Sequence, residues 1–104
     1  NRMAIEPDCN IGIGIAAPTI KHHVVSTGTQ QRLGYDVNNY ADFAVSSTGV
    51  LKLTSSSNKL AWGASRTPAS ATAAGTAGEI CWDAAYVYVC VAANAWRRAA
   101  LTTW

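Results

Sequence analysis

The final thirty residues most constrain what this chain can fold into, because the strand at their centre is apolar on both faces. That strand is predicted over residues 86–91, Tyr-Val-Tyr-Val-Cys-Val, where β-branched and aromatic side chains favour a pleated strand over a helix. Flanking strands are predicted over residues 79–83 and 96–101, with turns at 83–85 and 92–95. A strand with two apolar faces must be covered on both. A three-stranded meander cannot do this alone, so the sequence predicts a partner.

The rest of the chain also has the pattern of an all-β protein. Short apolar clusters recur about every eight to twelve residues and are separated by Gly, Ser, Thr and Asn. This spacing predicts short antiparallel strands joined as hairpins. Further strands are predicted over residues 10–15, 21–25, 30–36, 40–45, 50–54 and 60–63.

One hairpin is specified better than the others. The segment Ser46-Ser47-Thr48-Gly49 is typical of a hairpin turn between two of the predicted strands. Apolar and polar residues alternate on both sides of that turn, which predicts one apolar face and one mostly polar face. The apolar face is expected to carry Ala41, Phe43, Val45, Leu51 and Leu53.

Residues 64–78 differ in kind from what surrounds them. They are rich in Ala, Ser, Thr and Gly and contain no large apolar side chain. Such a composition is typical of an extended linker. We therefore expect a β-rich module over residues 1–63, the linker, and a C-terminal β module over residues 79–104.

The composition excludes some classes of partner. Charged residues make up 13 % of the chain, roughly half the usual share of a soluble domain. The net charge is only +2, and the basic residues are scattered except for Arg97-Arg98, so nucleic acid is not an expected partner. No apolar run approaches the roughly 20 residues that a membrane-spanning helix needs, and no signal peptide is recognisable. Since the chain opens without methionine, we expect a fragment of a longer protein that ends naturally at Trp104.

The three cysteines, Cys9, Cys81 and Cys90, give little support for a disulfide framework. Within the predicted meander Cys81 should lie opposite Val87 or Tyr88, so a bridge to Cys90 would require an unusual register. Free thiols in a protein assembled in a reducing cytosol are the favoured interpretation.

No motif in the chain predicts catalysis, a metal or a cofactor. The run from Gly12 to Ala17 spells G-x-G-x-x-A, but Pro18 interrupts the helix that a dinucleotide site needs. These glycines are better explained by close approach of backbones. His22 and His23 are adjacent and so point to opposite faces of a strand; only a symmetric oligomer could gather copies of one around a metal. The carboxylates form no recognisable acid–base pair, so we expect no enzyme.

The aromatic residues of the C-terminal module are the remaining candidates for a binding site. They would either pack a subunit interface, where Trp, Tyr and Arg are enriched, or stack against sugar rings. Arg97 and Arg98 point to opposite faces, so only one can join such a patch. The candidate contacts are Trp82, Tyr86, Tyr88, Trp96, Arg97 and Trp104.

Three parts of the chain resemble phage tail fibres, tailspikes and related trimeric fibre proteins. The first is Gly12-Ile13-Gly14 followed by Ala17-Pro18 and Lys21-His22-His23-Val24, similar to the family pattern G-I-G-T-x-x-P-x-x-x-L-H-V, although His22 stands where that pattern has Leu and Ala16 where it has Thr. The second runs from Arg32 to Gly49. The third and more specific is the closing module, in which Gly78 to Asp83, Tyr86 to Ala92 and Trp96 to Leu101 match.

The resemblance implies an intertwined parallel homotrimer with one core shared by three chains. It implies a virion protein, assembled in the host cytoplasm, whose residues 1–63 are shaft-like and whose residues 79–104 trimerise or form the tip. The implied function is attachment to a glycan or protein receptor on the host surface. Two alternatives stay open: a carbohydrate-binding module of a secreted protein, and a fibre that decorates the head or capsid.

Overall fold

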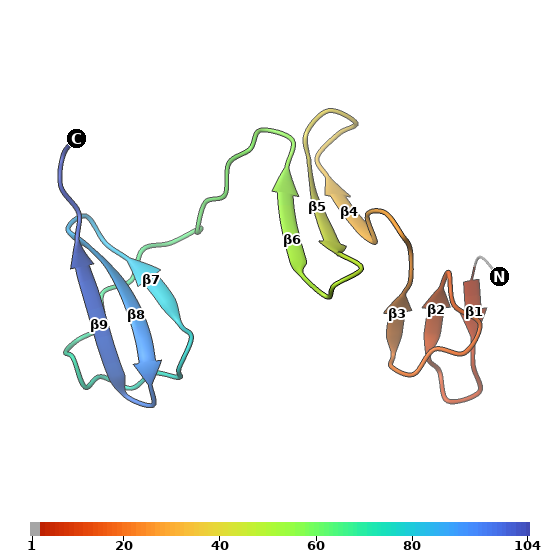
Figure 1. Ribbon diagram of the computed structural model, residues 1–104, viewed down its shortest axis with the longest axis horizontal. Helices are drawn as coiled ribbons and strands as arrows, with labels where there is room; N and C mark the ends of the chain where they lie inside the picture. The colour runs from red at the N-terminus through yellow and green to blue at the C-terminus, as the bar shows by residue number, and fades with distance from the viewer. Residues whose placement is uncertain (1–2) are drawn as a thin grey trace. The chain divides into compact units, whose positions relative to one another are not determined.

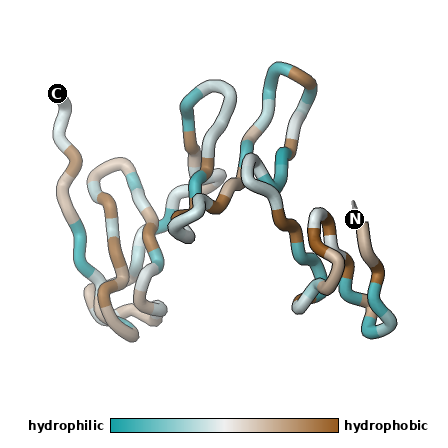
Figure 2. The backbone as a smooth tube through the Cα atoms, turned by 45° about the vertical axis from the view of Figure 1, so that its right-hand side comes forward, coloured by the Kyte–Doolittle hydropathy of each residue, from teal (hydrophilic) through white to brown (hydrophobic). Residues whose placement is uncertain are grey.

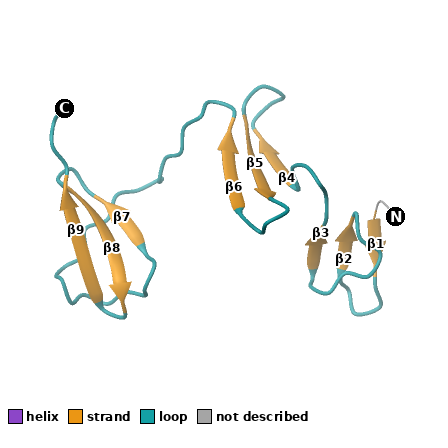
Figure 3. Cartoon of the chain, viewed as in Figure 1, coloured by secondary structure: helices purple, strands orange, loops and turns teal. Residues whose placement is uncertain are grey.

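The computed structural model describes residues 3–104, and β-strand is the only regular secondary structure in that range. Nine strands form three three-stranded sheets (Figures 1 and 3). The chain divides into two compact units, Asn1–Leu60 with two of the sheets and Ala61–Trp104 with the third. The predicted all-β class is confirmed. The described residues include no helix long and apolar enough to cross a membrane.

The first sheet contains β1 (Met3–Ile5), β2 (Ile11–Ile13) and β3 (His22–Val24). Strand β1 was not predicted, and β2 pairs with β3 in parallel rather than as a hairpin. The chain leaves β2 through Gly14, which has a φ of +75°, and a Cβ there would collide with the Val25 carbonyl oxygen. This confirms that glycine is needed for a close backbone approach.

The second sheet contains β4 (Gln31–Gly34), β5 (Tyr40–Val45) and β6 (Leu51–Ser55), all antiparallel. The predicted turn between β5 and β6 is confirmed, since the Gly49 N–H donates to the Ser46 carbonyl at 2.9 Å. The predicted strand at residues 60–63 is wrong. The Ser55 hydroxyl bonds both the N–H and the carbonyl of Lys59, so the chain turns away directly after β6.

The two faces of the second sheet differ as the alternation predicts. On the polar face Arg32 forms an ion pair with Asp42 at 2.7 Å and lies 3.6 Å from the centre of the Tyr40 ring. The register puts the apolar residues on the other face, where each is between 37 % and 63 % exposed. Short hydrophobic and hydrophilic segments follow one another along the backbone tube (Figure 2). We call the apolar side of this sheet the open apolar face; it consists of Leu33, Phe43, Val45, Leu51 and Leu53.

The third sheet is the predicted meander, with β7 (Ile80–Trp82), β8 (Tyr86–Ala92) and β9 (Ala95–Ala100). Every observed boundary lies within one residue of the predicted one. The register pairs Cys81 with Tyr88, one of the two partners expected. All three cysteines are free thiols, and Cys90 is fully buried whereas Cys9 is exposed.

Residues 66–78, here named the covering segment, lie across one face of this sheet and form no strand. Trp96 donates its backbone N–H to Ala71 at 2.9 Å and its indole N–H to Ala73 at 3.0 Å. A Cβ on Gly75 would lie 2.7 Å from the Trp96 ring, so the small residues of the segment allow it to approach closely. Beneath it lies the core of Tyr88, Cys90 and Trp96.

The covering segment corrects one prediction. The sequence predicts that both faces of the central strand must be covered and assigns this to a partner, but one face of β8 is covered by the chain itself. The opposite face remains open, with Ile80 57 % and Trp82 38 % exposed. Val87 and Val89 lie in register with these two residues and are only partly buried. Within one chain, only one face of the meander is therefore covered.

Candidate functional site

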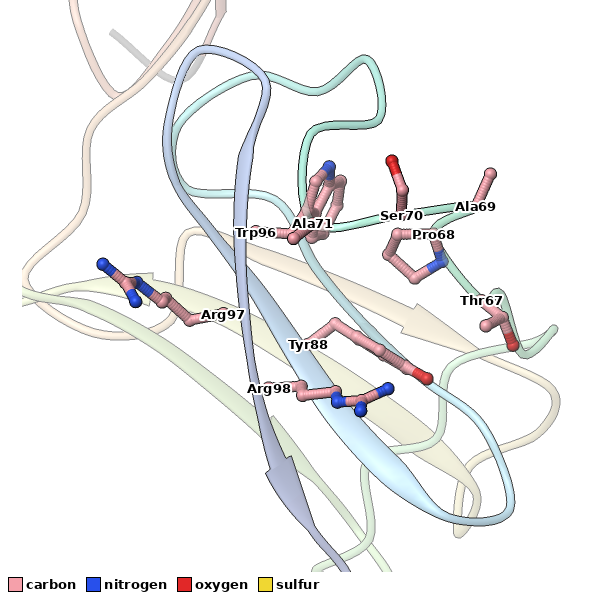
Figure 4. A pocket seen from close by; sticks show the side chains of 9 residues that line it. All are labelled: Thr67, Pro68, Ala69, Ser70, Ala71, Tyr88, Trp96, Arg97 and Arg98. Carbon is pink, nitrogen blue, oxygen red and sulfur yellow. The ribbon is translucent and has the colours of Figure 1, made fainter.

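A cavity of about 450 Å³ opens between the start of the covering segment and strands β8 and β9 (Figure 4). Its volume falls within the range of about 300 to 1,000 Å³ that is typical of ligand pockets. Proline, alanine and hydroxyl side chains of the covering segment form one wall, while aromatic and arginine residues of the sheet form the other. The lining residues are Thr67, Pro68, Ala69, Ser70, Ala71, Tyr88, Trp96, Arg97 and Arg98.

The carboxylate of Asp83 holds the two walls of this cavity together. Its Oδ2 accepts hydrogen bonds from the Tyr88 hydroxyl at 2.6 Å and from the Thr67 hydroxyl at 2.7 Å. Its Oδ1 accepts the backbone N–H groups of Ala85 at 2.8 Å and Tyr86 at 2.9 Å. One side chain thus connects the covering segment, the β7–β8 turn and strand β8.

These four donors favour the ionised carboxylate. The Tyr88 hydroxyl, then the Thr67 hydroxyl and the backbone N–H groups, hold the pKa of Asp83 well below its ordinary value. The same bond to Asp83, together with desolvation, raises the pKa of Tyr88, so this phenol stays protonated as a donor. A second carboxylate acts similarly: hydrogen bonds from the Thr76 N–H and from Arg66 lower the pKa of Glu79.

We expect the stability contributed by Asp83 to be lost in acid. A carboxyl whose pKa is lower in the folded chain than in the unfolded chain stabilises the fold. This stabilisation is complete at a pH well above the pKa of the unfolded chain, here 3.8, and is lost as the pH falls below that pKa. An Asp83→Asn variant should therefore unfold at lower urea than the wild type at neutral pH, and the two midpoints should converge below pH 3.8. Equal separation at neutral and acidic pH would contradict this role.

The two adjacent arginines lie on opposite faces of β9, as predicted. Arg98 pairs in register with Tyr88, and its guanidinium lies 4.1 Å from the centre of the Tyr86 ring. Arg97 pairs with Val89 on the other face. Figure 4 shows the Arg98 side chain beside Tyr88, whereas the Arg97 guanidinium points away from the cavity.

The structure brings together only part of the predicted aromatic patch. Tyr86 and Tyr88 have ring centroids 5.8 Å apart, and Trp96 lies on the same face of the sheet. Because Tyr88 and Trp96 are each only 6 % exposed, neither offers an open ring face for a sugar. Trp82 lies on the opposite face, in register with Val87, and Trp104 is fully exposed beyond β9.

Sequence reasoning did not identify several residues of the cavity. Thr67 and Ser70 belong to a segment whose composition is that of a linker, and no pattern marks them. Asp83 was assigned to a turn, which is correct, but its bonds to Thr67 and Tyr88 depend on how the covering segment folds back. Arg98 was not among the candidate contacts, where Arg97 was named instead, but its guanidinium lies over the Tyr86 ring.

No group of three or more potential metal ligands occurs within residues 3–104. Of the two histidines, His23 accepts a hydrogen bond from the Thr19 N–H at its Nδ1, 3.3 Å away. This contact gives His23 a local structural role in the first unit.

Part of the chain is similar to parts of two phage proteins. A segment of 36 residues, 35 % of this chain, is 50 % identical to "Depolymerase 1, capsule K30/K69-specific" of Klebsiella phage K5-2. A segment of 37 residues is 43 % identical to "Depolymerase, capsule K30/K69-specific" of Klebsiella phage K64-1. These matches span only 4 % and 5 % of the two relatives. No family model and no solved structure matches the chain.

The similarity associates about a third of the chain with phage proteins, in agreement with the resemblance seen in the sequence. Since so small a share of each depolymerase is matched, the similarity belongs to one region of those proteins and does not extend to the whole.

Proposed function

We propose that this chain is a structural, non-catalytic part of a trimeric phage fibre or tailspike that presents a distal tip to the host surface. Its partial similarity to two phage capsule depolymerases supports a place on a virion. In this proposal the chain trimerises during assembly in the host cytoplasm. The chemistry of degradation, where a fibre has it, belongs to other regions of the protein.

The observation that carries the proposal is the open apolar face of the second sheet. Five large side chains lie on one side of three paired strands and remain substantially exposed. Scattered exposed apolar residues are ordinary, but a contiguous group of this kind marks an interaction surface. The polar side of the same sheet already has its partners, in the Arg32–Asp42 ion pair.

A second copy of the chain is the partner that both units need. The uncovered side of the meander is also apolar and partly exposed, like the open apolar face of the second sheet. It carries Ile80, Trp82, Val87 and Val89. When identical chains assemble around a threefold axis, each contributes the same faces to a common core. Apolar burial between copies then supplies stability that a single thin sheet lacks.

Measurement of molar mass tests the proposal. We expect light scattering from the purified chain to give about three times the 10.9 kDa of one chain, because the apolar faces become buried only on association. The trimer should persist on dilution to micromolar concentration. A stable, folded species of 10.9 kDa would remove the basis for trimerisation.

A monomeric carbohydrate-binding module is the alternative that the cavity beside Tyr88 favours. It predicts a monomer of 10.9 kDa whose tryptophan fluorescence changes when sugar binds. Molar mass, measured in the same sample that binds sugar, separates the two functions.

A further inference from the structure

Arg98 is the one arginine of the second unit whose charge faces the cavity without an acidic partner. Among residues 3–104 the ion pairs join Arg32 to Asp42 and Arg66 to Glu79, and neither involves Arg98. Its guanidinium lies over the Tyr86 ring instead, which fixes the group at the cavity wall next to Tyr88. An arginine held in this way can present its planar donors to a carboxylate.

Hydroxyl groups line both walls of this cavity. Thr67 and Ser70 line the covering-segment side, and Tyr88 lines the sheet side. The Tyr88 hydroxyl donates its hydrogen to Asp83, and its oxygen, beside the Arg98 guanidinium, has a second lone pair with which to accept a hydrogen bond from a ligand. The buried state of the Trp96 ring removes stacking as the main mode of recognition, which leaves directional polar contacts.

We propose that this cavity binds an acidic sugar unit of a host-surface polysaccharide, with Arg98 receiving the sugar carboxylate and the hydroxyls of Thr67, Ser70 and Tyr88 contacting the sugar hydroxyls. The inference rests on the proposed attachment function and assigns it a site and a ligand class. The alanine and proline wall at residues 68, 69 and 71 supplies shape and apolar contact for the ring.

Asp83 is a negative group close to this site and opposes binding of an anion. Its charge is shared among four donors, two hydroxyls and two backbone N–H groups. Because these bonds occupy both oxygens, the carboxylate does not neutralise Arg98 through an ion pair. Asp83 therefore orders Thr67 and Tyr88 for the ligand and leaves the guanidinium available.

A matched pair of disaccharides tests the ligand class. Cellobiouronic acid and cellobiose differ only in a carboxylate against a hydroxymethyl group on one ring. Titration of the full chain, followed by calorimetry and tryptophan fluorescence, should show the acid binding about tenfold or more tightly than cellobiose. Acetate at equal concentration should not displace it. Equal affinity for both sugars, no binding of either, or displacement by acetate would overturn the proposal.

Two substitutions locate the site. Arg98→Gln should abolish the preference for the acid, so that both disaccharides bind with the affinity of cellobiose. Lys52→Gln removes the same charge from the other unit and should leave the preference unchanged. Arg97→Gln should keep the preference for the acid. If it lost this preference to the same extent as Arg98→Gln, the ligand would lie elsewhere and the assignment would be overturned. Molar mass measured on each variant reports separately on trimerisation, so failure of the sugar site and failure of the fibre proposal are distinguishable.

Discussion

Replacing Trp96 with alanine should unfold the C-terminal unit. Trp96 is one of three buried apolar residues in the core of that unit, and its ring contacts the covering segment at Gly75. The substitution removes the indole N–H bond to Ala73 and leaves a cavity beneath the covering segment. Truncation of a buried tryptophan typically costs about 3 to 5 kcal/mol. With so few other buried side chains, the covering segment should detach and the sheet should lose its order.

Urea unfolding followed by far-ultraviolet circular dichroism at a fixed chain concentration measures this effect. Trp104→Ala provides a matched control, because Trp104 is fully exposed beyond the last strand and its removal should shift the midpoint little. Hydrogen exchange should show that the backbone N–H of residue 96 loses its protection in the variant. In the wild type this group donates to the Ala71 carbonyl. If Trp96→Ala kept the wild-type midpoint and protection, the core assigned here would be wrong.

Because Trp96 belongs to the core, its substitution does not test receptor binding separately from folding. The sequence placed it among possible receptor contacts, in which case its removal would weaken binding without affecting assembly. The structure shows a ring that is 6 % exposed under the covering segment, so loss of binding in Trp96→Ala would report on folding. Arg98, on the same strand and at the cavity, separates recognition from stability.

The meander was predictable because its signals are local. Val87, Tyr88 and Val89 favour an extended backbone by their own shape, and the turn at Asp83 is short enough to fix the register. That register placed Cys81 opposite Val87 or Tyr88 in advance, and the structure pairs it with Tyr88. The hairpin around Gly49 was predictable for the same reason, since its alternation and its turn residues agree.

The covering segment was not predictable because its role depends on contacts that are distant in the sequence. Small residues without apolar bulk are typical of a linker, and the same lack of bulk lets residues 71–75 lie against the Trp96 ring. Only the folded chain shows that Ala71 and Ala73 supply carbonyls to Trp96. The parallel pairing of β2 with β3 is also long-range, and the spacing of apolar clusters contains no signal for it.

Leu53→Lys should convert the proposed trimer into single chains. Leu53 lies in the middle of the open apolar face, in register with Phe43, and is 51 % exposed within one chain. A lysine there is tolerated by an isolated chain because its ammonium reaches water. In a trimer, three such charges would be buried against apolar side chains, and an unpaired buried charge costs about 3 to 5 kcal/mol. That penalty, repeated in each copy, exceeds what one leucine contributes to the contact.

Thr54→Lys is the matched control, because the neighbouring residue points to the opposite, polar face. Thr54 pairs in register with Asp42, on the side that holds the Arg32–Asp42 ion pair, so a lysine there remains solvated in any oligomer that uses the apolar face. Light scattering should therefore give the mass of one chain for Leu53→Lys and of three for Thr54→Lys, with similar circular dichroism spectra. A trimer that survives Leu53→Lys would exclude this face from the interface. Dissociation by both variants would point to added charge in general, because the two differ only in the face that carries it.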